Sequence, residues 1–135
     1  MILGVDPGTR RVGLAAGDLA TGFARPLEVI DTREVDPVER IVTVCREIGA
    51  TLIVVGMPLS LSGARGPQAV AVEAFAGRLR AVAPVDVRLH DERLTTVVAE
   101  SGLRAAGARP ARRKKLRDAI AAQAMLQGYL DTHSQ

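Results

Sequence analysis

The stretch ILGVDPGTRRVGLAAGD, residues 2–18, joins two apolar runs through a carboxylate and a Pro-Gly turn. Residues 2–6 and residues 11–18 predict two strands connected by a short turn, which is a hairpin. The first strand thus ends on Asp6, a residue type that core packing does not require. An acid at this position either caps the turn or serves a site at the end of the strand.

The rest of the chain predicts alternating strands and helices around this hairpin. A third strand over residues 23–31 contains Pro26, which favours an edge position. Asp36 and Pro37 form the start of a helix that Gly49 ends. The β-branched run at residues 51–56 is typical of a strand buried in a parallel sheet. Further elements are expected at residues 69–82 (helix), 85–90 (strand), 94–106 (helix) and 114–131 (helix).

This order predicts an α/β protein with one mixed central sheet flanked by helices. A length of 135 residues fits a single domain over residues 1–135. No apolar run approaches the roughly 20 residues of a membrane span, and no secretion signal is recognisable. Cys45 is the single cysteine, which excludes an internal disulfide and suits a reducing compartment. We therefore expect a cytoplasmic protein with no membrane partner.

Basic residues gather in one stretch, RPARRKKLR at residues 109–117, which holds six of the eighteen Lys and Arg. Such a run is either a solvated segment or a contact for an anionic partner. Aromatic residues are limited to Phe23, Phe75 and Tyr129. Modules that hold single strands by stacking need aromatic platforms, so we expect any nucleic acid to be held by its backbone and shape.

Three acidic positions lie where strands end or where a helix carries an apolar face. Asp6 ends the first strand, Glu92 follows Asp91 directly after the strand at residues 85–90, and Asp118 shares a helix face with Ala122. Singly, these acids have structural interpretations: a turn cap, an ion pair with the neighbouring arginine, and a helix cap. Together in one cleft they would repel unless a cation compensated them. Carboxylate ligands without a Cys or His cluster suit Mg²⁺ or Mn²⁺.

Four motifs make the chain resemble the YqgF/RuvX family, the pre-16S rRNA nucleases that are also described as Holliday junction resolvase-like. They are GVDPGTRRVGLAAGD (residues 4–18), VVGMPLSLSG (54–63), VRLHDERLTTVVAE (87–100) and KKLRDAIAAQAML (114–126). They stand in the family's order and cover essentially the whole chain. Pro7 departs from the family pattern, in which many members carry a bulkier residue, but the carboxylate of Asp6 and the glycine at position 8 remain.

The resemblance implies an RNase H-like fold with Asp6, Glu92 and Asp118 as catalytic residues and metal ligands. It also implies cleavage of phosphodiester bonds that depends on Mg²⁺ or Mn²⁺, by a two-metal mechanism. Family members are linked to maturation of the 5′ end of 16S rRNA, and some act on branched DNA. The expected partner is therefore structured nucleic acid, either pre-rRNA or a four-way DNA junction. A junction resolvase also favours a homodimer, because it needs two sites.

Nucleic-acid contacts are expected from donors around these acids. They are predicted from the turn after Asp6, the polar loop at residues 57–67, the residue after Glu92 and the basic run. The candidates are Thr9, Arg10, Arg11, Ser60, Ser62, Arg65, Arg93, Arg109, Arg112, Arg113, Lys114, Lys115 and Arg117.

Two other functions remain open from the residues. The DPGTRRVG stretch also suits an actin-like ATPase or kinase, although such proteins close two lobes around ATP and no P-loop is present. The basic run also suits a non-catalytic RNA-binding factor in ribosome assembly. That reading gives no reason for acids in a cleft that binds a polyanion.

Overall fold

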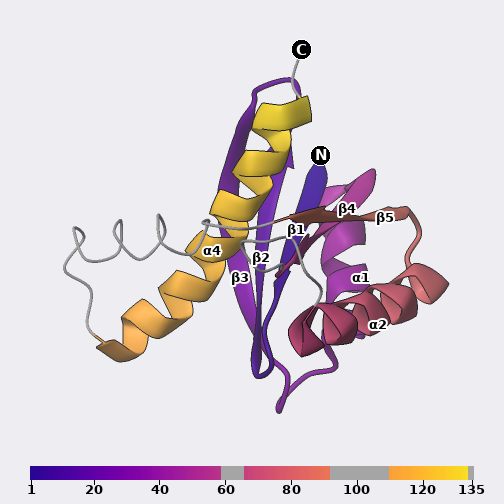
Figure 1. The fold of residues 1–135 in the computed structure, drawn as a ribbon. Helices are drawn as coiled ribbons and strands as arrows, with labels where there is room; N and C mark the ends of the chain where they lie inside the picture. The colour runs from indigo at the N-terminus through magenta and orange to yellow at the C-terminus, as the bar shows by residue number, and fades with distance from the viewer. Residues whose placement is uncertain (59–65, 92–109, 134–135) are drawn as a thin grey trace.

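The structure, a computed structural model, describes residues 1–58, 66–91 and 110–133, and for residues 110–116 it describes the backbone alone. The order of elements in Figure 1 is three strands, a helix, a strand, a helix, a strand and a last helix. Their bounds are β1 Ile2–Pro7, β2 Arg11–Asp18, β3 Phe23–Asp31, α1 Pro37–Ile48, β4 Leu52–Met57, α2 Pro67–Val82, β5 Asp86–Asp91 and α4 Pro110–His133.

The strands form one mixed sheet in the order β3-β2-β1-β4-β5. β1, β2 and β3 run antiparallel as a meander, whereas β4 and β5 run parallel to β1. β1 is therefore the central strand, and the carboxyl ends of β1, β4 and β5 meet at one edge of the sheet. This edge is the place where open α/β sheets hold their sites.

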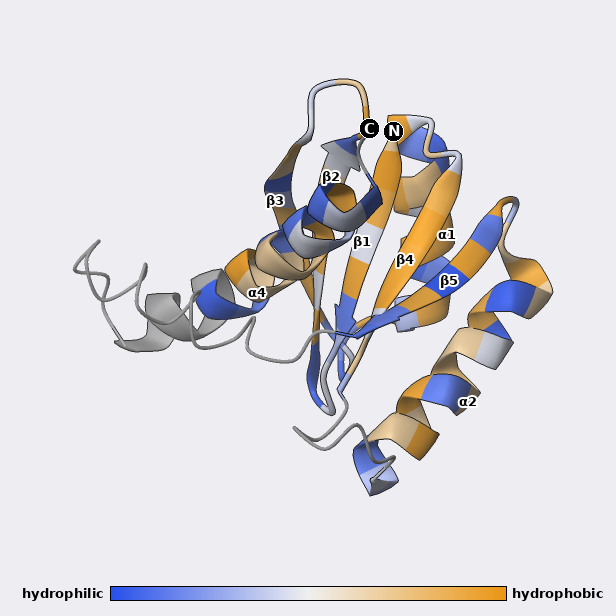
Figure 2. Ribbon diagram, turned by 45° about the horizontal axis from the view of Figure 1, so that its top comes forward, coloured by the Kyte–Doolittle hydropathy of each residue, from blue (hydrophilic) through white to orange (hydrophobic). Residues whose placement is uncertain are grey.

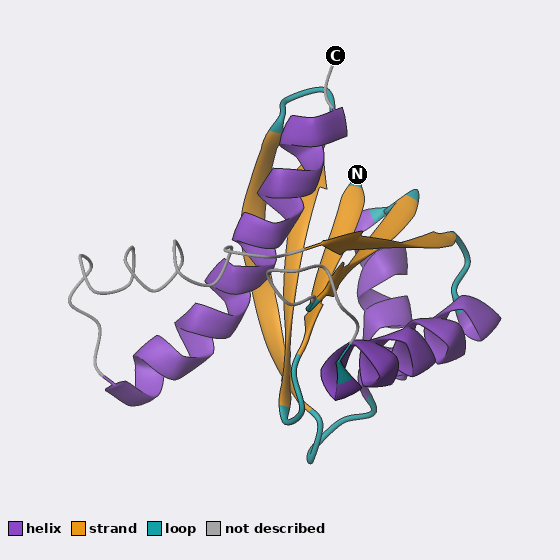
Figure 3. Ribbon diagram, in the orientation of Figure 1, coloured by secondary structure: helices purple, strands orange, loops and turns teal. Residues whose placement is uncertain are grey.

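The two faces of the sheet are covered by different helices, as Figure 3 shows. α1 and α2 cover one face, with Leu3 and Val5 of β1 fully buried beneath them. α4 covers the other face, against Ile2 of β1 and Val54 of β4. Because side chains alternate along a strand, β1, β2, β3 and β4 each contribute to both cores, whereas β5 adds Val87 to the core under α1 and α2. The mixed sheet flanked by helices that the sequence predicts is confirmed.

Glycines let α4 approach the sheet closely. A Cβ atom on Gly4 would lie 2.9 Å from Leu126 Cβ, and one on Gly17 would lie 2.9 Å from Leu130 Cδ1. Real Cβ atoms do not approach so closely, so these positions stay small in order to admit the buried leucines of α4. Figure 2 shows the hydrophobic stretches of β1 and β4 in the middle of the sheet.

Helix α1 begins and ends as its sequence predicts. The Asp36 carboxylate accepts a hydrogen bond from Val38 N at 3.0 Å, and Pro37 occupies the first turn. Gly49 ends the helix in the left-handed region at φ 66°, a conformation that favours glycine. Cys45 is buried in the apolar stripe, as expected for a core residue.

The predicted elements agree with the observed ones to within two residues, except at α4. The helix begins at Pro110 rather than at residue 114, so most of the basic run forms its first turns. Proline is tolerated in a first turn, and Ala, Arg, Lys and Leu all have high helix propensity. The sheet places β3 at its edge, as Pro26 predicts, with a register shift between Leu14 and Ala15 on β2. The helix expected at residues 94–106 lies outside the described residues.

Among the residues with a described structure, no helix is both long enough and apolar enough to cross a bilayer.

Candidate functional site at the carboxyl edge of the sheet

Asp6 lies at the carboxyl end of the central strand, half-buried, and faces α4. Ile2 and Gly4, which share its side of β1 by alternation, both contact α4. Leu3 and Val5 point into the opposite core. The hydrophobic side chains of β1 thus give way at this edge to a carboxylate on the α4 face, and Figure 2 shows the change in colour at the end of the strand.

Asp118 comes to the same place through Gly13. In the β1–β2 ladder Asp6 is directly opposite Gly13. A Cβ atom on Gly13 would overlap the backbone carbonyl oxygen of Asp118, so α4 touches β2 at this point. Paired residues on neighbouring antiparallel strands have Cβ positions about 5 Å apart on one face. Asp6 and Asp118, which are distant in sequence, therefore lie on the same face at the same edge.

A guanidinium group accompanies the two acids. Arg11 Nη1 lies 3.8 Å from Asp118 Oδ2, and the two side chains are 16% and 32% exposed. Arg11 and Gly13 are two residues apart on β2, so they lie on the same face of the strand, the one that α4 covers. The neighbouring Arg10 instead pairs with Asp31 at 4.0 Å and is about half exposed. Of the two arginines expected to contact nucleic acid, Arg11 thus belongs to the acidic site, and Arg10 lies on the surface of the hairpin.

The end of β5 lies at the same level of the sheet. β1 pairs Val5 with Val55, and β4 pairs Gly56 with His90, so Asp6, Gly56 and His90 form one row across three strands. Two strand spacings separate β1 from β5, or about 10 Å. By alternation Asp91 points to the face opposite His90, away from Asp118. Glu92, the expected third acid, follows next in sequence and lies outside the described residues.

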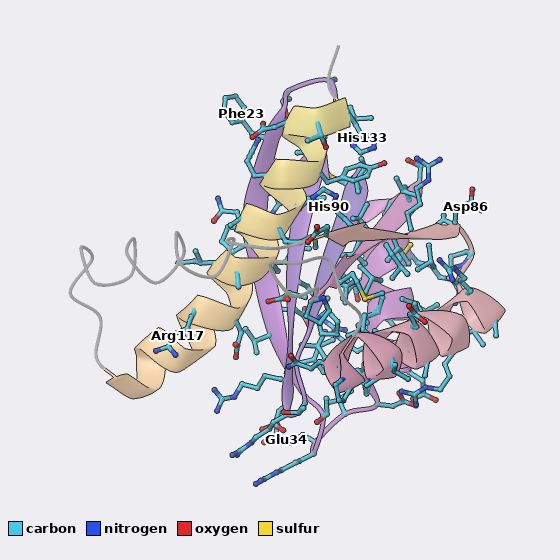
Figure 4. The ribbon with its side chains drawn as sticks, viewed as in Figure 1. Phe23, Glu34, Asp86, His90, Arg117 and His133 are labelled. Atoms are coloured by element: carbon cyan, nitrogen blue, oxygen red, sulfur yellow. The ribbon has the colours of Figure 1, made fainter. Side chains whose placement is uncertain are left out.

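His90 packs against the last turns of α4. Its ring meets Tyr129 edge-on, with 5.6 Å between centroids and an interplanar angle of 87°, and Tyr129 stacks on His133 at 4.0 Å. The Tyr129 hydroxyl accepts a hydrogen bond from Arg88 Nη1 at 3.1 Å. Figure 4 shows His90 on β5 beside α4 and His133 at the end of that helix. Burial, assisted by the charge of His133, lowers the pKa of His90, and Asp91 partly opposes that shift. His90 therefore serves as a packed strand-end residue.

Several predicted contacts lie where the structure describes no side chain. Glu92, Ser60, Ser62, Arg65, Arg93 and Arg109 are outside the described residues, whereas Arg112, Arg113, Lys114 and Lys115 are in the backbone-only part of α4. Arg117 is half-buried one residue before Asp118, in the part of α4 that extends past the sheet in Figure 4. Thr9 is exposed at the hairpin turn.

The donor chemistry at this edge is that of carboxylate oxygens. Asp6 and Asp118 are half-buried, and the residues with described side chains contain no cluster of three or more His, Cys, Asp or Glu that could hold a metal ion. Carboxylate oxygens suit a hard cation better than zinc. Asp6 and Asp118 thus fit part of the ligand set for Mg²⁺ or Mn²⁺.

Sequence reasoning missed Gly13, the residue that allows the backbone of α4 at Asp118 to approach the strand pair that carries Asp6. Its signal was present in the alternation of small residues along β2, at Gly13, Ala15 and Gly17. Three successive small residues on one face of a strand predict close approach of a covering element.

The mixed sheet with helices on both faces is an RNase H-like fold, with Asp6 at the end of its central strand and Asp118 on the helix that covers that strand. The chain matches the structure of Thermus thermophilus RuvC in complex with a Holliday junction substrate with a TM-score of 0.55 and 17% identity, over 98% of this chain and 96% of that one. The fowlpox virus Holliday junction resolvase matches with a TM-score of 0.55 and 11% identity, over 97% and 98%. At these identities the likeness establishes the fold.

Sequence comparison gives the family. The family described as RuvX, Holliday junction resolvase, matches residues 1–132. A Chloroflexus aggregans protein is 42% identical over 131 residues, 96% of this chain and 92% of that protein. A Nocardioides protein is 46% identical over 135 residues, 96% of this chain and 86% of that protein. Both carry the name "Putative pre-16S rRNA nuclease". The chain belongs to the RuvX family.

Proposed function

We propose that residues 1–135 form one nuclease domain that hydrolyses phosphodiester bonds at the carboxyl edge of its sheet, and that its substrate is the 5′ end of pre-16S rRNA. The observation that supports the proposal is the contact of Gly13 with the backbone of Asp118 opposite Asp6, because it brings α4 close to the end of the strand that carries Asp6. Family membership and the names of the relatives support the substrate.

In this proposal Asp6 and Asp118 hold a divalent cation, Mg²⁺ or Mn²⁺, and Glu92 completes the set. In the two-metal mechanism, one bound cation would activate the attacking water and a second would stabilise the leaving oxygen. Arg11 compensates the carboxylate of Asp118. Gly8 permits the tight turn after the strand, since a Cβ atom there would overlap the carbonyl oxygen of Arg11. The basic first turns of α4 bring positive charge to the phosphates beside the site.

A four-way DNA junction is the second candidate substrate. The family description and the RuvC-like fold favour it. A resolvase acts on two strands and needs two sites, whereas trimming of an RNA end needs one. The mass of the protein in solution, measured with and without a junction, therefore accompanies the activity measurement, and a dimer on the junction would favour resolution.

The experiment compares cleavage of two substrates with Mn²⁺ or Mg²⁺ present: an RNA carrying the 5′ precursor of 16S rRNA, and a four-way DNA junction. Three proteins are used: the unmodified chain, Asp6→Asn, and Asp86→Asn as a control. Asp86 is exposed at the start of β5, far from the carboxyl edge, and its substitution changes the net charge equally.

We expect the unmodified chain and Asp86→Asn to cut the RNA. The cleavage rate of Asp6→Asn should fall by roughly 100-fold or more, because the variant lacks a ligand for the cation that assists catalysis. Equal cleavage by all three proteins would identify a contaminant and refute the proposal. Cleavage of the four-way junction but not of the RNA would identify branched DNA, in place of pre-16S rRNA, as the substrate. A rise in melting temperature with ATP, without cleavage, would favour an actin-like ATPase or kinase. RNA binding that persists in EDTA, without cleavage, would favour a non-catalytic RNA-binding factor.

A further inference from the structure

A cavity of about 360 Å³ lies at the same edge of the sheet, on the face opposite Asp118. The hairpin turn at Gly8 and Thr9 forms one wall, Thr32 after β3 forms another, and α2 forms the third. Val12 and Val72, which also line it, belong to the core under α1 and α2. The cavity is therefore separate from the acidic site, and its volume lies within the roughly 300–1,000 Å³ typical of ligand pockets.

The walls combine an apolar floor with neutral polar groups and one cation. The floor includes the buried ring of Phe75. Thr9, Thr32 and Gln68 add hydroxyl and amide groups, and the Arg78 guanidinium carbon lies 5.8 Å from the centroid of the Phe75 ring. Among the described residues that line it, none carries a carboxylate. Such walls suit a flat heterocycle that carries hydrogen-bonding edges and is attached to an anion.

The position of the cavity relative to Asp6 suggests which heterocycle enters it. Pro7 and Gly8, the residues directly after Asp6, are part of the lining. A strand whose phosphate lies at Asp6 on the α4 face is therefore separated from the cavity by the turn alone. We propose that the cavity binds an unpaired base of the substrate strand, next to the phosphate that is cut.

This inference rests on the proposed nuclease function and deepens it by assigning a substrate feature. Removing a base from a stack costs a few kcal/mol, and least when the base is already unpaired. The cavity thus selects cleavage positions where a nucleotide is unpaired. The scarcity of aromatic residues led us to expect that nucleic acid is held by its backbone and shape alone. The cavity changes that expectation, because the ring of Phe75 and the guanidinium of Arg78 together provide a stacking site for one base.

The test fills the cavity from its exposed rim. Ala71 lines the cavity and is exposed on α2, whereas Ala74 is exposed on the same helix and is absent from the lining. Ala71→Phe should block the cavity, and Ala74→Phe adds the same ring to the same helix as the matched control. Arg78→Gln, also at an exposed position, is a second variant in case Ala71→Phe melts at a markedly lower temperature.

Binding is measured in EDTA by fluorescence anisotropy, with duplexes that carry one unpaired nucleotide or an abasic residue at that position. Stacking contributes about 1–3 kcal/mol per base, so we expect the unmodified chain to prefer the intact ligand by about 10-fold. Ala71→Phe should abolish the preference, Arg78→Gln should reduce it, and Ala74→Phe should keep it. Equal affinities for both ligands in the unmodified chain, or a full preference retained by Ala71→Phe and Arg78→Gln, would overturn the inference.

The same proteins are assayed for cleavage with Mn²⁺, which separates the two possible failures. A base preference without cleavage would refute the nuclease proposal and leave a base-binding cavity. Cleavage without a base preference would support the nuclease and refute the subsite.

Discussion

The backbone carbonyl of Asp118 occupies the space that a Cβ atom on residue 13 would need, so Gly13 sets the distance between α4 and the sheet. Because Asp6 lies opposite Gly13 in the ladder, the same contact brings the backbone of Asp118 beside the strand pair that carries Asp6. One residue without a side chain thus links the packing of the last helix to the chemistry of the first strand.

Gly13→Ala should therefore impair activity and stability together. The new methyl group overlaps backbone rather than a flexible side chain, so α4 must move away from β2, at a cost of about 1–3 kcal/mol. Gly77→Ala is the control, because Gly77 is helical and a Cβ atom there would meet nothing within 4 Å. We expect Gly77→Ala to be neutral or slightly stabilising. Chemical denaturation and cleavage assays check both variants, and normal stability and activity for Gly13→Ala would show that the contact is not needed.

Arg11→Gln should strengthen the binding of Mn²⁺. The guanidinium lies 3.8 Å from Asp118 Oδ2 and repels a cation that approaches the same carboxylate. Its removal should lower the dissociation constant of Mn²⁺ measured by calorimetry, while Arg11→Lys should leave it nearly unchanged. Because the pair is partly exposed, the loss of stability without metal should stay within about 1 kcal/mol. Weaker Mn²⁺ binding in Arg11→Gln would mean that Arg11 supports the site in another way.

The thiol of Cys45 should react slowly with reagents in the folded protein. Its burial should also make the protein less stable at alkaline pH. Burial raises the pKa of its thiol, and the neighbouring Arg46 only partly offsets this. As the pH rises past the ordinary thiol range, the unfolded chain loses the proton while the folded chain keeps it, so the free energy of unfolding falls. Urea denaturation at neutral and alkaline pH checks this, with Cys45→Ala as the variant that lacks this contribution. Rapid reaction of the native thiol with a disulfide reagent would contradict its burial.

Local signals in the sequence predicted most of the fold. The Asp36 and Pro37 start of α1, its Gly49 end and the β-branched run of β4 each appear where propensity and capping place them. The start of α4 was harder to predict, because a block of like charge resembles a solvated loop although its residues are good helix formers. Pro110 marks the observed start.

The candidate site was predicted only in part, because it depends on contacts between distant segments. The position of Asp6 follows from the end of a strand, and the apolar face of α4 suggests that Asp118 lies near the core. Their proximity depends on Gly13, and the ion pair of Arg11 depends on which face of β2 it occupies. Neither contact leaves a local pattern around Asp118. The cavity at Thr9 arises from the spacing between α2 and the hairpin turn, which sequence periodicity does not encode.

The central claim is that Asp6 and Asp118 hold the same cation. Its most direct test is a crystal structure of the protein soaked in Mn²⁺, with the ion located by anomalous scattering. We predict a manganese peak within about 2.0–2.4 Å of carboxylate oxygens from both residues, the range for hard cations. A peak bound to one of the two acids alone, or manganese found only elsewhere on the molecule, would contradict the account.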